Sequence, residues 1–231
     1  MTDKIHRVPR LWSNRELRKF APIFKGMSIV NVSAWRDEDK EGGTYRNYFS
    51  GASEYSVTNF DADKRGFQGG DGEIFLNLEK SLPSELQSRF DVVFNHTTLE
   101  HVYEFRTAFR NLCDMSKDVV IVVVPFLQQM HADYGDYWRF TPQALHRMFE
   151  DEGFEVAHLS FNNDFQSSVY VFCIATKNPD QWRSHFSFSP NYADASFSHL
   201  PEPFAGSNAV HSNWRTALQG WLISRRAKRA R

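Results

Sequence analysis

The segment FDVVFNHTTLEHV, residues 90–102, constrains the fold of this chain more than any other. Residues 92–94 give the continuous apolar run of a strand that is covered on both faces. The run stops at Asn95, and a polar cluster continues from there to His101. In open α/β sheets, ligands bind beyond the carboxyl ends of the strands. The segment therefore predicts a buried strand with a functional edge at its end.

Strand-like and helix-like patterns alternate along the chain, which predicts an α/β fold with a doubly wound, mostly parallel seven-stranded sheet. Ser13 or Asn14 is expected to cap a helix that ends at Phe24. A second helix is expected at 102–115, and a third begins with a Thr141 cap. Strands are predicted at 27–32, 55–60, 74–78, 90–95 and 118–125, and a C-terminal antiparallel hairpin at 154–161 and 169–176.

Charge and cysteine content narrow the class of protein. The net charge of −1 argues against a general nucleic-acid binder, although the last seven residues carry five basic groups. Cys113 and Cys173 lie in apolar contexts and indicate buried free thiols in a reducing compartment. No apolar run resembles a secretory signal or is long enough to span a bilayer. These features predict a cytoplasmic protein.

Two segments resemble known methyltransferases. The FDVV…LEHV pattern closely resembles the fourth-strand motif of class I S-adenosylmethionine (SAM)-dependent methyltransferases. This resemblance covers about residues 25–177 and implies their Rossmann-like fold, with SAM as cofactor. Residues 125–140, PFLQQMHADYGDYWRF, resemble the segment after the fifth strand in small, type 11-like methyltransferases of the cell-surface polysaccharide type. That second resemblance implies O-methylation of a sugar hydroxyl, with a glycan or another small molecule as acceptor.

The resemblance also implies where SAM binds. A carboxylate after the second strand is expected to accept hydrogen bonds from the ribose diol, and Asp61 holds that position, with Asp63 as the alternate. Either Asp71 or Asn77 matches the region that supplies a polar contact to adenine. The wall after the fourth strand is expected to include His96, Thr97, Thr98 and Leu99.

The first motif of the family departs from its usual form. The family has an acidic residue and a glycine-rich turn after the first strand, which lets the backbone approach the cofactor. Here Asn31 replaces the acid, and Ser33 and Ala34 stand where glycines are expected. Trp35, which follows, is bulky. Asn31, Ser33 and Ala34 are still assigned to the cofactor site.

Methyl transfer to a hydroxyl requires a group that removes its proton, and a neutral imidazole suits that task. His131 is the first candidate base and His96 the second, with loop anchoring as the alternative role of His131. Asp133, Tyr137 and Arg139 are expected to bind the acceptor. No metal site is predicted, because the histidines are dispersed along the sequence.

The sequence divides into a helical extension (1–24), a methyltransferase-like domain (25–177) and a C-terminal region (178–231) with an aromatic wrap and a basic amphipathic helix. This helix either docks on the domain or on a second subunit, or rests on anionic lipid at the inner face of a membrane. Two alternative functions stay open. One is a binding or scaffold protein that has lost catalysis, and the other is a nucleic-acid methyltransferase that uses the basic tail.

Overall fold

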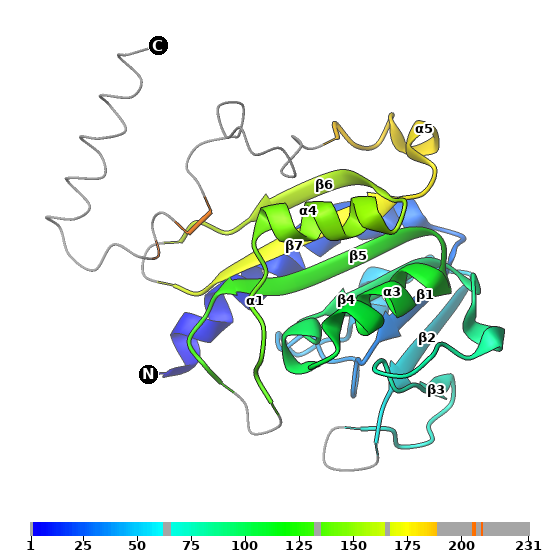
Figure 1. The fold of residues 1–231 in the computed structure, drawn as a ribbon, viewed down its shortest axis with the longest axis horizontal. Coiled ribbons are helices and arrows are strands. Elements are labelled where there is room, and N and C mark those ends of the chain that lie inside the picture. The colour runs from blue at the N-terminus through cyan, green and yellow to red at the C-terminus, as the bar shows by residue number, and fades with distance from the viewer. Residues whose placement is uncertain are drawn as a thin grey trace, which may run out of the picture.

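One seven-stranded sheet, in the order β3-β2-β1-β4-β5-β7-β6, organises the computed structural model (Figure 1). The structure describes residues 2–61, 66–131, 135–164, 167–188, 205–206 and 209. β1 to β5 run parallel to one another, whereas β7 is antiparallel to both β5 and β6. This topology confirms the predicted fold class. The strands are β1 (Ser28–Val32), β2 (Glu54–Asn59), β3 (Glu73–Phe75), β4 (Phe90–His96), β5 (Ser116–Leu127), β6 (Glu155–Phe161) and β7 (Val169–Thr176).

Helices cover both faces of the sheet and enclose two hydrophobic cores. α3 and α4 lie on one face (Figure 1), and α1, α2 and α5 bury their apolar residues against the other. The helices are α1 (Thr2–Phe20), α2 (Tyr45–Tyr48), α3 (Phe105–Met115), α4 (Pro142–Asp151) and α5 (Pro179–Trp182), with 3₁₀ turns η1 (Ala21–Phe24), η2 (Ser84–Leu86) and η3 (Leu99–His101).

β4 and β5 form the centre of the sheet. Each is hydrogen-bonded on both sides, and residues 119–124 are at most 1% exposed. Alternate residues of β5 enter opposite cores, which explains why the strand reads as an unbroken apolar run. The parallel pairing places the carboxyl ends of β1, β2, β3, β4 and β5 at one edge of the sheet.

Several predicted boundaries differ from the structure, and three of the differences have a local reason or change an element. β5 continues past Pro125 to Leu127, because the chain accommodates the missing proline N–H with a register shift between these two residues. The helix predicted from residue 102 begins only at Phe105, after the separate turn η3. β3 is shorter than predicted and ends at Phe75.

α1 is longer than the helix predicted from the capping pattern, since it starts at Thr2 instead of Ser13. Ser13 and Asn14 are not caps. Both are fully buried and bond to groups at the carboxyl edge of the sheet. A small polar residue on the buried stripe of a helix has the same sequence signature as an N-cap, and only the tertiary contact separates the two.

Most of the C-terminal region lies outside the described residues. The predicted aromatic wrap and basic helix fall in residues 189–231, so their docking and membrane alternatives stay predictions, as does the division into three parts. Within the described residues of that region, Trp182 is buried and its Nε1 donates to Asp118 Oδ2 at 2.8 Å. No described helix is long and apolar enough to cross a membrane.

Candidate functional site

The loop after β1 has positive φ angles, which glycine favours, at residues that are not glycine. Ser33 and Trp35 have φ angles of 57° and 50°, in the left-handed region that side chains disfavour. Asn59, at the end of β2, holds the loop there. Its Oδ1 accepts from Trp35 N at 2.6 Å, and its Nδ2 donates to Trp35 O at 3.0 Å. Hydrogen bonds from Asn59 therefore hold a strained turn at the place where the family has glycines.

Asp37 is the centre of this loop and was missed in the sequence. Its Oδ1 accepts from Asn31 Nδ2 and from the Tyr55 hydroxyl, both at 2.7 Å. Its Oδ2 accepts from Arg46 N at 2.8 Å. The carboxylate that is absent at Asn31 is thus supplied six residues later. Burial and the adjacent Asp37 raise the pKa of Tyr55 well above its ordinary value.

The ends of β2 and β3 carry an exposed aromatic pair beside the predicted ribose carboxylate. Asp61 is exposed and follows Phe60, which is 46% exposed. The Phe60 ring lies 5.8 Å from that of Phe75, which is 55% exposed. Large apolar rings are rarely left in water without a partner, so these two offer a stacking surface. The sequence analysis missed this pair.

The two residues predicted to contact adenine lie beyond opposite ends of β3. Asn77 follows the strand at its carboxyl end, and its Oδ1 accepts from Glu79 N at 2.9 Å. Asp71 precedes the strand and is exposed. Asn77 is therefore the residue placed at the functional edge. Asp63 lies outside the described residues.

His96, at the end of β4, is buried beneath α1. Arg10 Nη1 approaches its Nδ1 at 2.9 Å, and Ser13 Oγ approaches its Nε2 at 2.8 Å. Because a guanidinium can only donate, Nδ1 carries the lone pair and Nε2 the proton. Burial and the neighbouring Arg10 hold the pKa of His96 well below its ordinary value. Its one lone pair is thus engaged, and this geometry favours the other candidate base.

Arg10 brings a buried cation to this edge. Besides His96, its guanidinium donates to the Tyr45 hydroxyl at 3.1 Å and to Thr97 Oγ1 at 2.9 Å. No described carboxylate lies within ion-pairing distance of it. Leu99, the last residue of the predicted wall, is fully buried in the core and can present only its backbone.

The loop after β5 folds back over η3 and orients His131. Asp136 Oδ2 accepts from the His131 backbone N at 2.7 Å and lies 3.3 Å from its ring Nδ1. Arg139 binds both oxygens of Asp136. The hydrogen bonds from Arg139 lower the pKa of Asp136 to about 2. Asp136 therefore fixes the backbone at His131 and places a carboxylate beside its imidazole.

The two remaining acceptor candidates have different positions. Tyr137 is 52% exposed, and its ring lies 5.4 Å from that of Tyr103, itself 61% exposed. Together they form a second exposed aromatic surface, and Tyr137 lies on the same loop as His131. Arg139, for which an ion pair with Asp133 or Asp136 is the alternative to acceptor binding, pairs with Asp136. Its acceptor binding stays a prediction. Asp133 lies outside the described residues.

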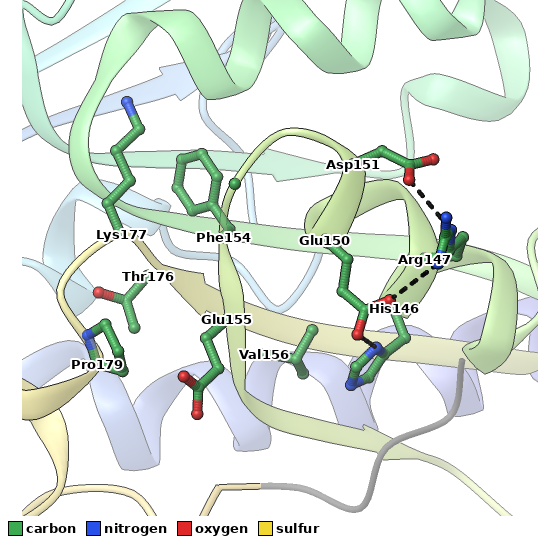
Figure 2. A pocket seen from close by; sticks show the side chains of 11 residues that line it. His146, Arg147, Glu150, Asp151, Phe154, Glu155, Val156, Thr176, Lys177 and Pro179 are labelled. Atoms are coloured by element: carbon green, nitrogen blue, oxygen red, sulfur yellow. Dashed lines mark ion pairs between the residues drawn. The ribbon is translucent and has the colours of Figure 1, made fainter. Parts of the chain in front are cut away.

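A hollow of about 580 Å³ lies at the opposite edge of the sheet (Figure 2). It is bordered by the end of α4, the start of β6 and the end of β7. Because Thr176 pairs with Val119 near the start of β5, this is the amino edge. Arg147 and His146 project toward Glu150 and form ion pairs with it, as Figure 2 shows. None of the residues predicted for the site lines this hollow.

Comparison with known proteins identifies the fold. Neither a protein-family model nor a curated protein matches the chain. A Bacillus halodurans protein provisionally assigned as a methyltransferase aligns with a TM-score of 0.54 and 12% identity, over 71% of this chain and 97% of that one. Magnesium protoporphyrin IX methyltransferase from Synechocystis PCC 6803, with bound S-adenosylhomocysteine, aligns with a TM-score of 0.53 and 11% identity, over 77% and 87%. The trans-methyltransferase CalH, also with S-adenosylhomocysteine, gives 0.53 and 16% identity, over 71% and 57%. At these identities, what the chains share is the methyltransferase fold.

The strained backbone at Ser33 predicts how a glycine there changes the free energy of unfolding. Ser33→Gly should stabilise the protein by roughly 0.5–1 kcal/mol, because glycine adopts a positive φ without cost. Ala34→Gly is the matched control and should destabilise by a similar amount, since residue 34 has no positive φ to relieve. Urea unfolding measures both changes. Equal destabilisation by the two substitutions would show that the loop is not strained at residue 33.

Burial of neutral His96 predicts a pH dependence. The pKa of His96 in the folded protein lies below its unfolded value of 6.5. Its contribution to the free energy of unfolding is therefore complete above pH 6.5 and is lost as the pH falls. Between pH 7.5 and 5.5 the loss should approach about 1.4 kcal/mol for this one group. The stability difference between wild type and His96→Gln should shrink by that amount in urea unfolding. A difference that stays constant over this range would contradict the burial of a neutral imidazole.

Proposed function

We propose that the protein transfers the methyl group of SAM to an oxygen of a small acceptor, in particular a sugar hydroxyl in glycan assembly. One observation carries the proposal: a single edge of a methyltransferase fold gathers an exposed carboxylate with aromatic rings and, three strands along the sheet, an imidazole with a carboxylate 3.3 Å from its ring. The first group suits a nucleoside, and the second suits proton removal. The sugar acceptor rests on the resemblance of residues 125–140 to polysaccharide-type methyltransferases.

Asp61, Phe60 and Phe75 provide the chemistry that the nucleoside half of SAM requires. The exposed carboxylate can accept two hydrogen bonds from the ribose diol. The exposed rings offer a face on which a purine stacks. Asn77, beyond the end of β3, adds an amide near the purine edge.

Arg10 and the loop after β1 suit the amino-acid half of SAM. A buried guanidinium without a described anionic partner is costly, and an incoming carboxylate would compensate its charge. The strained turn at Ser33 directs the backbone toward the same space at the end of β1. The cofactor would therefore extend along the edge from β2 to β4.

His131 would act as the base on the acceptor side. As the acceptor oxygen attacks the sulfonium methyl carbon, the methyl–sulfur bond breaks and S-adenosylhomocysteine leaves. The hydroxyl proton passes to the imidazole, and Asp136 stabilises the resulting imidazolium. The exposed rings of Tyr103 and Tyr137 offer a flat surface for a sugar ring. Most of the remaining acceleration would come from holding oxygen and methyl in line.

One observation favours the alternative of a binding protein without catalysis. The loop after β1 contains Trp35 where the family has a small turn, and Asn59 fastens it by two hydrogen bonds. If this loop does not admit the cofactor, the fold would serve only as a scaffold. Cofactor binding separates the two functions.

Asp61→Ala should weaken binding of SAM and of S-adenosylhomocysteine at least about tenfold, because it removes both ribose hydrogen bonds. Asp180→Ala is the control, since that carboxylate is exposed on α5 at the amino edge of the sheet. Calorimetric titration measures both. Failure of the wild type to bind either compound would refute the proposed function and leave the scaffold alternative.

His131→Ala should lower kcat roughly 10²–10⁴-fold while leaving cofactor affinity unchanged, as expected for loss of a general base. His158→Ala, on β6 beside Glu16, should change neither quantity. The assay follows transfer of the labelled methyl group of SAM to a panel of monosaccharides and oligosaccharides. Label recovered on nitrogen, on carbon or on nucleic acid would refute O-methylation of a sugar.

A further inference from the structure

Glu100 is a fully buried carboxylic acid without a hydrogen-bonding partner. Its side chain is 0% exposed, and neither Oε1 nor Oε2 has a partner among the described residues. It lies in η3, where its backbone oxygen accepts from Tyr137 N at 2.8 Å and thereby joins the loop after β5. Buried polar groups are almost always satisfied, so an orphaned carboxylate calls for an explanation.

His101 directs a ring nitrogen at this carboxylate. Its Nδ1 lies 2.6 Å from the Gly135 carbonyl oxygen, which can only accept, so Nδ1 carries the proton and Nε2 the lone pair. Nε2 lies 3.7 Å from Glu100 Oε1. The lone pair of His101 Nε2 therefore faces the Glu100 carboxyl group. A histidine that donates one ring N–H to a backbone carbonyl and offers the other nitrogen is the usual arrangement of a metal ligand.

His131 completes the group from the loop after β5. Its ring lies 5.1 Å from that of His101, centroid to centroid. One ligand atom from each of Glu100, His101 and His131 lies within 4.8 Å of the other two. Gly135 O orients the His101 ring by a hydrogen bond, and the Asp136 carboxylate lies 3.3 Å from His131 Nδ1.

We propose that Glu100, His101 and His131 form a binding site for a divalent transition-metal ion. Two imidazoles and one carboxylate are ligands that suit Zn²⁺, Fe²⁺ or Co²⁺ and not Mg²⁺ or Ca²⁺, which prefer oxygen. Ligand atoms around Zn²⁺ stand roughly 3.4 Å apart when each bond is about 2.1 Å, so the three groups need to close by roughly 1 Å. The remaining coordination positions would take water or an acceptor oxygen.

The positions of the three residues explain why sequence spacing predicts no metal site. Glu100 and His101 follow β4, and His131 follows β5, so 30 residues separate the two histidines. Parallel pairing of the two strands brings their carboxyl ends together. Arg10 and Arg139 both act electrostatically on Glu100. Arg139 binds both oxygens of Asp136, which offsets its charge near a metal ion.

The metal site deepens the proposed function without depending on it. A bound ion would coordinate His131, the residue proposed to accept the hydroxyl proton. With an ion bound, the lone pair of His131 would be engaged by the metal. Metal ions lower the pKa of a bound hydroxyl group, so the proton of a coordinated acceptor would pass to solvent water instead of to His131. Metal binding is measurable without SAM or an acceptor, and either proposal can fail while the other stands.

The test is titration of the chelator-treated, dialysed full-length protein with ZnCl₂ by calorimetry and with CoCl₂ by visible absorption. Wild type should bind one Zn²⁺ per chain, with Co²⁺ giving the d–d absorption of a low-coordinate protein site. Glu100→Gln and His101→Gln should each weaken Zn²⁺ binding at least about tenfold. His146→Gln is the matched control, because His146 faces Glu150 at 3.6 Å at the amino edge of the sheet.

Circular dichroism and thermal unfolding show whether each variant is folded. Glu100→Gln is expected to fold, because it replaces a buried carboxylic acid by a neutral side chain of the same shape. Zn²⁺ binding that both ligand variants retain in full would overturn the proposal and indicate adventitious binding elsewhere. Absence of binding by the wild type would also overturn it, and a proton shared between Glu100 and His101 would then explain their approach.

Discussion

Parallel pairing of β4 with β1 on one side and β5 on the other is the constraint on which the site depends. The three strands are buried on both faces, so their order and register are fixed by the two cores. Their carboxyl ends must then lie at one edge, and every polar group that follows a strand is brought to the same place. Glu100, His101 and His131 are close for this reason, although they are spread over 32 residues of sequence.

Compensation of buried polar groups is the second theme of this edge. Asp37 accepts a hydrogen bond from Asn31, and Asn59 accepts one from the strained turn at Trp35. Arg10 supplies a hydrogen bond to the lone pair of His96. Arg10 and Glu100 are the exceptions, since each retains a charge or a set of lone pairs that no described residue matches. Uncompensated groups at the carboxyl edge of a methyltransferase fold are what a binding site for charged ligands requires.

The sequence predicted the elements whose signals are local. The apolar runs of β4 and β5 and the Thr141–Pro142 start of α4 carry their own pattern, and Thr141 Oγ1 accepts from Ala144 N as expected of a cap. The long-range contacts could not be predicted. Asp37 reads as one acid in a charged loop, and Arg10 reads as one of many exposed cations. Their roles depend on partners that lie up to 87 residues away along the chain. The roles of the predicted site residues themselves stay predictions.

The central claim is that the carboxyl edge of this sheet binds SAM in spite of a first loop without glycine. A crystal structure of the protein grown with saturating S-adenosylhomocysteine tests it most directly. The ligand should lie across the ends of β1, β2 and β4, with the ribose at Asp61, the carboxylate at Arg10 and the sulfur facing the side of His131. An empty carboxyl edge, or a ligand seated instead in the hollow beside Glu150 at the amino edge, would contradict it.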